Sequence, residues 1–469
     1  MPTVTSVPGV YIEEEASPSM SVSLGATAVP LFIGRFTPLK AKQKGVITRI
    51  SSWLDYSTLF DATTVFSAKV VLTSTLAEPE PETKVKASLA TKSTSSKAVK
   101  KPAKAAADVK KQAYTYTIDS VEVLVPTVSV ALQLYFQNGG GPCYIYPIEN
   151  QDDTTQLSAL PGLLDEVGDI TLLACPETEK AYRTAVYGAL MVSLDQQKGY
   201  FLLADSSDGG KPDGLNSSAH AAVYYPDLMS ASQVTKFDDE RVAIEGFVDE
   251  AGTTVATLAD LQKINAELAK DISQQLVKKR PAQLVIPPSA IMAGVYCKTD
   301  RERGVWKAPA NVVLNGVSDV SVRVTDDAQG GMNLAGINVI RHFSDRGLVV
   351  WGGRTLQDDD NWRYIPVRRL FDTAQRDIKK ALRPMLFEPN SQPTWKRVQA
   401  AIENYLYGLW LQGGLAGNKA KEAYSVRIGK GITMTQDDIN QGKMIIQVGM
   451  AAVRPAEFII LQFTQDMAQ

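Results

Sequence analysis

The side chains that most often carry acid–base, nucleophilic or metal chemistry are scarce in this sequence. Its 469 residues include two histidines, His220 and His342, and three cysteines, Cys143, Cys175 and Cys297. Histidine has an ordinary pKa near neutrality, so hydrolytic triads and most metal sites depend on it. The cysteines are odd in number and far apart, which favours buried, reduced thiols over a disulfide framework or a zinc site. The sequence therefore offers little material for a catalytic centre.

Two further motifs could suggest a binding site. The glycines at 139–141 do not form a phosphate loop, because no Gly-Lys-Ser/Thr follows and they precede a strand-like segment instead of opening a helix. Asp358–Asp360, and Asp437 with Asp438, could hold a metal, but turn and capping roles are more common. The sequence also lacks a G-x-S-x-G elbow. We therefore predict no catalytic, cofactor-binding or metal-binding residues and no cofactor; the alternative is an α/β hydrolase-like enzyme.

The composition is that of a globular protein with two or three domains, since 44% of the residues are hydrophobic and 21% are charged. The formal net charge of -2 gives no support for a nucleic-acid partner, which would normally require a more basic chain. The first residues, MPTVTSVPGVYIEEE, have neither a basic nor an apolar leader region, and no stretch reaches the length of a membrane span. We expect a protein made and used in solution, without direct membrane insertion.

Helix-like and strand-like segments alternate between residues 128 and 203. The helical segments are SVALQLYF and AYRTAVYGALMVSL, and the strand-like segments are CYIYPI, ITLLACP and YFLLAD. Such alternation predicts an α/β domain with a mostly parallel sheet. Before it, Val29–Ile33 and VITRI at 46–50 read as strands, and a helix is expected to begin at Ser51 or Ser52.

Two β-prone segments enclose a lysine-rich stretch. SAKVVLTSTL and AYTYTIDSVEVLV are rich in β-branched and aromatic residues, and nine lysines lie between Lys84 and Lys111. The stretch has too little apolar surface to offset the entropy of ordering, so we expect a mobile surface loop at the tip of a hairpin. A basic tail that contacts an anionic partner is the alternative.

Three helices are predicted farther along the chain. Apolar residues of 256–276 recur at intervals of three and four, which predicts one helix with a buried stripe. A second helix lies within 367–384, and a third begins after an N-cap at Thr394 and stops at Gly413-Gly414. On the second helix, basic residues oppose the apolar face: Arg369, Arg376, Lys379, Lys380 and Arg383.

Both ends of the chain carry short apolar runs. Near the start, Val10, Tyr11 and Ile12 follow Pro-Gly and precede three glutamates. Near the end stands a continuous run, Phe458, Ile459, Ile460 and Leu461. A continuous apolar run is typical of a strand covered on both faces, and a bare strand of this kind would be prone to aggregation. Either the final strand lies within its own monomer's sheet, or it pairs with a sheet of a neighbouring subunit.

The longest motifs lie in the second half of the chain. They are PPSAIMAGVYCKTDRERGVWKAPAN at 287–311, then WGGRTL, WRYIPVRRLF and TMTQDDINQGKMIIQVGMAAVRPAEFIILQF. PGVYIEE and FQNGGGPCYIY occur in the first half. Together these strings resemble the phage tail sheath family from one terminus to the other. The lysine-rich insertion has no counterpart in the compact members of the family, and residues 205–282 match it only loosely.

The resemblance implies a structural sheath subunit of a contractile, phage-tail-like injection system, not an enzyme. Its copies would stack as hexameric rings into a helical sheath around an inner tube protein, and contraction would drive the tube through a target envelope. Further expected partners are baseplate and terminator components and other sheath paralogues. The particle would assemble in the bacterial cytoplasm and form part of a virion tail or a released particle.

The resemblance also assigns roles to the residues above. Both terminal runs, Val10–Ile12 and Phe458–Leu461, would be intersubunit strands added to neighbouring sheets. Arg369, Arg376, Lys379, Lys380 and Arg383 would contact an acidic inner tube, although a solvated charged face is the simpler alternative.

The expected fold class is mixed α/β and α+β, in several domains. It has a subtilisin-like α/β core, a C-terminal assembly domain with exchanged terminal β-strands, and a β-rich inserted outer region. The expected segments are an N-terminal arm and first strand (1–36), a β-rich region with the lysine-rich insertion at about 67–113 (37–127), the α/β core (128–345) and the assembly domain (346–469).

Overall fold

The computed structural model of the chain divides into two compact units. It describes residues 21–460 with the exception of 64, 77–113, 126, 151, 197, 232–236 and 250–251. The first unit takes its described residues from 1–63, 127–231 and 283–469, and the second from 64–126 and 232–282. The inserted region thus comes from two separate stretches of sequence, whereas the sequence analysis placed it in 37–127 alone.

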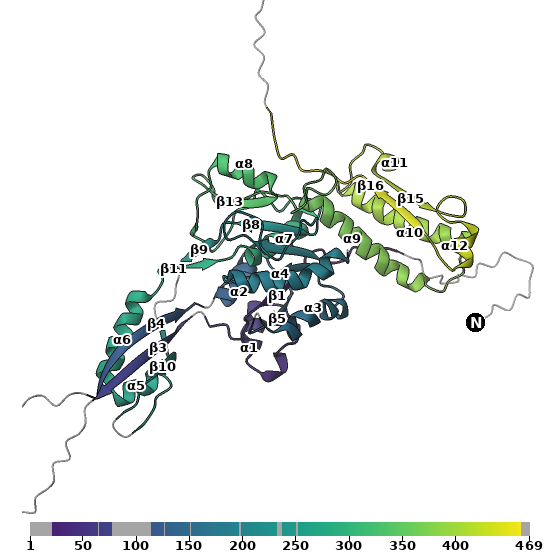
Figure 1. The fold of residues 1–469 in the computed structure, drawn as a ribbon. Coiled ribbons are helices and arrows are strands. Elements are labelled where there is room, and N and C mark those ends of the chain that lie inside the picture. The colour runs from purple at the N-terminus through teal and green to yellow at the C-terminus, as the bar shows by residue number, and fades with distance from the viewer. Residues whose placement is uncertain are drawn as a thin grey trace, which may run out of the picture. The chain divides into compact units, whose positions relative to one another are not determined.

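An eight-stranded sheet forms the centre of the first unit (Figure 1). Its strands, in spatial order, are β14 (Gly347–Trp351), β13 (Ile337–Phe343), β8 (Ala221–Tyr225), β7 (Phe201–Asp205), β6 (Leu172–Ala174), β1 (Pro30–Gly34), β5 (Cys143–Pro147) and β2 (Thr48–Ile50). The six central strands are parallel, while β14 and β2 pair antiparallel at the two edges. The predicted mostly parallel sheet is confirmed. Because β14 completes this sheet, the expected boundary at 345/346 falls between two paired strands.

Helices cover both faces of this sheet. On one face, α3 (Thr154–Glu166) and α4 (Lys180–Asp195) pack over Leu31 and Ile33 of β1. On the other, α2 (Thr127–Gln137) and α7 (Ser289–Arg303) pack together, and the Tyr135 ring of α2 contacts Phe32. Successive residues of a strand point to opposite faces of the sheet, so Leu31 and Ile33 face α3 and α4, whereas Phe32 faces α2. The helix α1 (Trp53–Leu59) begins after an N-cap at Ser52, as predicted.

The C-terminal part of the first unit is built on two long helices. These are α9 (Ile365–Leu382) and α10 (Gln392–Leu411), and they share an apolar cluster with a two-stranded sheet of β15 (Tyr424–Ile428) and β16 (Ile446–Met450). The predicted N-cap of α10 at Thr394 is wrong, because the helix starts after Ser391 and Thr394 is buried in its first turn. Its end before Gly413, where φ is +81°, is confirmed.

Smaller elements complete the first unit. They are two short 3-10 helices (Ala41–Gln43 and Arg383–Met385), a three-stranded sheet of β11 (Gln283–Ile286), β9 (Leu228–Ala231) and β12 (Asp319–Val320), and the helices α8 (Asp326–Leu334), α11 (Ala420–Ala423) and α12 (Gln436–Asn440). No helix in the described part of the chain is both long and apolar enough to cross a membrane.

The second unit packs two helices on a three-stranded sheet. Its strands are β10 (Phe237–Glu245), β3 (Phe66–Leu76) and β4 (Tyr114–Leu124), and both strands predicted around the lysine-rich stretch are confirmed. The lysine-rich stretch itself lies outside the described residues. The helix predicted over 256–276 is two helices, α5 (Leu258–Ile264) and α6 (Ala266–Lys279). Asn265 separates them, because its backbone is not helical (φ -139°, ψ 85°) and its side chain caps the start of α6 by accepting from the Leu268 N–H.

Candidate functional site

The two histidines are not part of a catalytic triad. His220 precedes β8, and its Nδ1 lies 3.3 Å from Asp372 Oδ2 of α9, while Arg368 binds the other oxygen of the same carboxylate. These side chains are buried, and they join α9 to the sheet. His342 is exposed on β13. His220 thus has an acid beside it, but in the described ranges no serine hydroxyl is hydrogen-bonded to the ring of either histidine, as a hydrolytic triad requires.

A buried carboxyl stands at the end of β7, the edge where enzymes with parallel sheets bind substrate. Asp205 Oδ1 accepts a hydrogen bond from the Ser289 backbone at 2.7 Å, and its Oδ2 has no described partner. Burial raises the pKa of Asp205 to about 7, although the nearby Arg183 guanidinium opposes the shift. A second carboxyl, Asp227, adds repulsion. Because His220 stands at the opposite ends of these parallel strands, Asp205 has no histidine to act with.

The remaining candidate ligands have structural roles. No group of three or more His, Cys, Asp or Glu side chains within the described ranges could hold a metal ion. Asp359 accepts hydrogen bonds from the backbone of Asn361 and Trp362, and Asp438 forms a capping box with Thr435. The three cysteines are buried and unpaired, as predicted.

Arg369, one of the five basic residues predicted to form an exposed stripe on α9, is buried. Arg369 is 3% exposed and forms a bidentate ion pair with Asp300 of α7, with N–O distances of 2.9 and 2.6 Å. Its guanidinium also lies over the Tyr296 ring, 4.7 Å from the centroid. The first half of α9 is packed against the core on all sides, so Arg369 is a structural anchor and the prediction that it contacts an inner tube is wrong.

The rest of the stripe becomes exposed toward the end of α9. Arg376 is half-buried and donates to the Gly199 carbonyl at 3.2 Å, so it also anchors the helix. Burial lowers the pKa of Arg376, with Asp372 opposing the shift. Lys379, Lys380 and Arg383 are exposed, and none of them forms an ion pair with a described residue. Along α9, the free positive surface is therefore confined to the last turns of the helix.

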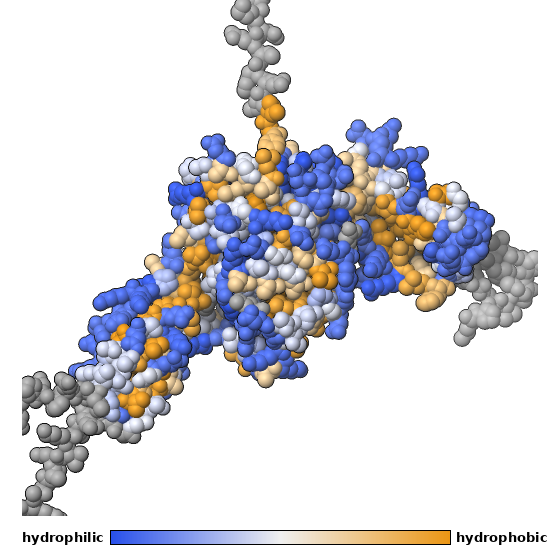
Figure 2. Space-filling model, viewed as in Figure 1, coloured by the Kyte–Doolittle hydropathy of each residue, from blue (hydrophilic) through white to orange (hydrophobic). Residues whose placement is uncertain are grey.

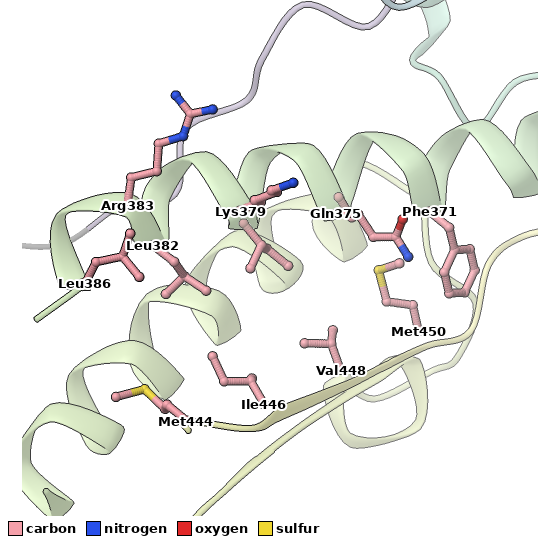
Figure 3. Close-up of a pocket in the computed structure, with 12 residues that line it drawn as sticks. Phe371, Gln375, Lys379, Leu382, Arg383, Leu386, Met444, Ile446, Val448 and Met450 are labelled. Atoms are coloured by element: carbon pink, nitrogen blue, oxygen red, sulfur yellow. The ribbon is translucent and has the colours of Figure 1, made fainter. Parts of the chain in front are cut away.

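An apolar groove of about 720 Å³ lies between α9 and β16. Figure 3 shows Ile446 and Val448 of β16 pointing toward α9, with Leu382 and Leu386 on the opposite side. These β16 side chains are only half-buried, and Gln447 and Gly449 face away. In the described part of the chain β16 pairs with β15 alone, so its second edge has no strand partner. The groove is lined by Phe371, Ala374, Gln375, Ile378, Lys379, Leu382, Arg383, Leu386, Met444, Ile446, Val448 and Met450.

The last described residues form an extended arm. After β16, Ala452 bridges to Leu415, and Glu457 accepts hydrogen bonds from Arg354 of the α/β core. Beyond that point Phe458, Ile459 and Ile460 are 71%, 81% and 82% exposed. Figure 1 shows this segment leaving the body of the unit, and Figure 2 shows apolar surface there.

The described part of the predicted final strand is therefore not inside its own monomer's sheet, which removes that alternative for Phe458–Ile460. Leu461 and the N-terminal run Val10–Ile12 lie outside the described residues. Neither the groove nor the Glu457 contact was predicted from the sequence. A carboxylate standing next to an apolar run was the available signal for the latter, and nothing in the sequence pointed to its partner Arg354.

Comparison with known proteins identifies close relatives. A family model described as the phage tail sheath protein central domain matches residues 213–356, and one for the phage tail sheath C-terminal domain matches residues 357–466. Together they cover more than half of the chain. A curated tail sheath protein of Vibrio phage KVP40 is 28% identical over 134 residues, covering 28% of this chain and 20% of that protein. Alignments with the curated relatives span no more than 25% of the relatives' own length.

Solved structures match over the whole chain. A chain of the anti-feeding prophage helical sheath in its contracted state is 57% identical, with a TM-score of 0.71 and coverage of 99% of this chain and 100% of that one. A chain of the PVC sheath complex of an extracellular contractile injection system, also contracted, is 36% identical with a TM-score of 0.65 and 99% coverage of both chains.

The buried Arg369–Asp300 pair yields a stability prediction. Arg369→Gln leaves Asp300 buried without its partner and should lower the free energy of unfolding by about 3–5 kcal/mol. Lys380→Gln, on the exposed end of the same helix, should change it by less than about 0.5 kcal/mol. Urea unfolding followed by circular dichroism measures both, and equal effects of the two substitutions would contradict the assignment.

The buried carboxyl of Asp205 yields a pH prediction. Between its ordinary pKa of 3.8 and the folded-state value of about 7, this group is ionised only in the unfolded chain. Stability should therefore fall as pH rises through this window, by roughly 2.5 kcal/mol between pH 5 and 8. Asp205→Asn keeps the acceptor for Ser289 and should remove this loss. Urea midpoints at several pH values test it; parallel pH profiles of wild type and variant would refute it.

Proposed function

Since the chain belongs to the phage tail sheath protein family, we propose that it is the structural sheath subunit of a contractile, phage-tail-like injection particle. Copies stack as hexameric rings around an inner tube protein, and the sheath contracts to drive that tube through a target envelope. Baseplate and terminator components, and any sheath paralogues, bind at its ends or within it. The particle assembles in the bacterial cytoplasm and works in a virion tail or a released particle.

Two unsatisfied features of the described part of the chain carry the proposal: an exposed apolar run that pairs with no strand, and a sheet edge to which no strand is paired. The exposed run Phe458–Ile460 has the apolar composition of a buried strand. The free edge of β16 borders a groove whose walls are apolar. We propose that the run of one copy lies along β16 of another, with the N-terminal run Val10–Ile12 added in the same way.

Simple magnitudes support this arrangement. Burying a Phe or Ile side chain contributes roughly 1.5–3 kcal/mol, and each strand hydrogen bond contributes about 1 kcal/mol net. One exchanged strand is thus a modest link once the cost of ordering it is included. Six copies per ring, repeated along a sheath, make many such links act together. A lattice connected in this way stays joined while its subunits rotate.

The charged end of α9 gives the second proposed contact. Lys379, Lys380 and Arg383 are exposed cations on one helix end and are suited to an acidic inner tube. Such contacts are screened by salt and break readily, which suits an interface that must release on contraction. Arg369 and Arg376 support this surface from beneath by fixing α9 to the core.

Contraction in this proposal needs no nucleotide and no enzymatic step. The α/β core, for which we propose a subtilisin-like topology, is a scaffold, and neither histidine in it is arranged for catalysis. Free energy is stored in a metastable extended lattice and is released as interfaces between subunits improve. No described feature favours the hydrolase-like alternative.

Val448→Asp tests the groove. Val448 faces α9 beneath the free edge of β16, so a carboxylate there should block docking of an apolar strand and abolish sheath cylinders. Gln447→Asp is the matched control, because it places the same charge on the opposite face of the same strand. Electron microscopy scores the cylinders, and circular dichroism checks folding. Normal assembly of a folded Val448→Asp chain would exclude the groove as the docking site.

Charge reversal tests the tube contact. Lys380→Glu combined with Arg383→Glu should reduce cosedimentation with inner tube at least tenfold, because attraction becomes repulsion. Both residues are exposed, so folding should be unaffected. Lys396→Glu and Arg397→Glu on α10 form a control pair of equal charge change. Unchanged cosedimentation, or an equal loss with the control pair, would refute the assignment.

A further inference from the structure

The chain between β16 and the exposed apolar run is fixed at two points. The first is the bridge between Ala452 and Leu415 in the C-terminal part of the unit. The second is Glu457, which contacts the α/β core. Between these points the backbone has no regular secondary structure, and immediately after Glu457 the side chains become exposed. Glu457 is thus the last anchored residue in the described part of the arm.

Four hydrogen-bond donors from the core hold the Glu457 carboxylate. Arg354 reaches both oxygens, with Nε 3.0 Å from Oε1 and Nη2 2.7 Å from Oε2. Asn333 Nδ2 of α8 donates to Oε1 at 2.8 Å, and the Tyr364 hydroxyl at the start of α9 donates to Oε2 at 3.2 Å. A bidentate guanidinium pair with further donors is among the strongest and most directional contacts that a carboxylate can make. Burial opposes ionisation here, yet these donors hold the pKa of Glu457 below its usual value.

Arg354 is rigidly held for this contact. Its backbone N–H donates to Asn338 Oδ1 at 2.7 Å, and its carbonyl accepts from Asn338 Nδ2 at 2.8 Å. Its Nη1 donates to the Asn333 carbonyl at 3.1 Å. The residue is 7% exposed, and Glu457 is the only carboxylate among the described residues that pairs with it. A buried guanidinium without an acid partner is strongly unfavourable, so the core itself requires Glu457.

We propose that Arg354 and Glu457 form a clasp that fixes the exchanged C-terminal strand to the α/β core of its own subunit. This inference rests on the proposed exchange of Phe458–Ile460 between copies. A pull from a neighbouring copy then passes through Glu457 into Arg354, which follows β14 of the eight-stranded sheet. The strands β15 and β16 precede the clasp in the chain, so they do not carry the pull on their own subunit's arm. Two strands alone resist separation poorly, and with the clasp in place they bear only the load of the strand docked on them.

Glu457→Gln is the direct test, because it keeps the shape of the side chain and removes its charge. Arg454→Gln is the control: this exposed residue lies on the same arm, three positions earlier. In the isolated, folded chain, chymotrypsin cleavage after Phe458 requires the flanking residues, Glu457 included, to leave the core. Glu457→Gln should raise the rate of this cleavage about tenfold, and Arg454→Gln should leave it unchanged. Mass spectrometry of the released C-terminal peptide identifies the site.

Whether the pull between subunits passes through Glu457 and Arg354 is tested on assembled cylinders. Cylinders of Glu457→Gln should dissociate at a lower urea concentration than those of wild type or Arg454→Gln. Unchanged cleavage after Phe458 would overturn the clasp, and faster cleavage with unchanged dissociation would overturn its role under load. If the wild-type chain forms no cylinders, the proposed function fails, while the cleavage result still decides the clasp. Should Glu457→Gln not fold, Tyr364→Phe removes one donor and should raise cleavage by a smaller factor; no rise with that variant would overturn the clasp.

Discussion

A strand edge exposes a row of backbone N–H and C=O groups that water or another strand must satisfy. The free edge of β16 adds a second unmet requirement, because its side chains stand half-covered over an apolar groove beside α9. One added strand satisfies the backbone and the side chains together. The same chain offers Phe458–Ile460, which is exposed and apolar. In the proposed assembly, this groove receives the arm of another copy, and the Glu457 contact holds the arm to its own core.

The helix α9 connects that sheet to the core. Its first half is buried and held by charged contacts, among them Arg369 with Asp300 and Arg368 with Asp372. Its last turns form one wall of the groove and carry the exposed Lys380 and Arg383. The helix α9 is therefore one continuous element between the groove and the α/β core. The clasp at Glu457 connects the arm to the same core by a second route.

Local sequence patterns predicted most helices and strands correctly, but they predicted less well which side chains are buried and what those side chains contact. Alternating helix and strand signals predicted the parallel sheet, because buried strands need continuous apolar runs whatever they pair with. The spacing of apolar residues along α9 placed Arg369 and Lys380 on the same polar face. This spacing does not show which part of the helix is buried in the core, so Arg369 was assigned to the surface. Thr394 resembled an N-cap, yet Ser391 and the proline at the second helical position fix the start earlier. The Glu457 clasp joins residues 103 positions apart, and no local pattern encodes such a contact.

Strand exchange requires that the sheet begun by β15 and β16 be completed by a strand from another copy. A cryo-electron microscopy map of assembled cylinders, at a resolution that traces side chains, tests it most directly. Strand exchange predicts an extended chain that is hydrogen-bonded along the free edge of β16, has its apolar side chains in the groove and is continuous with a different subunit. A map in which Phe458–Ile460 folds back onto its own subunit, or in which the edge of β16 stays without a strand, would contradict it.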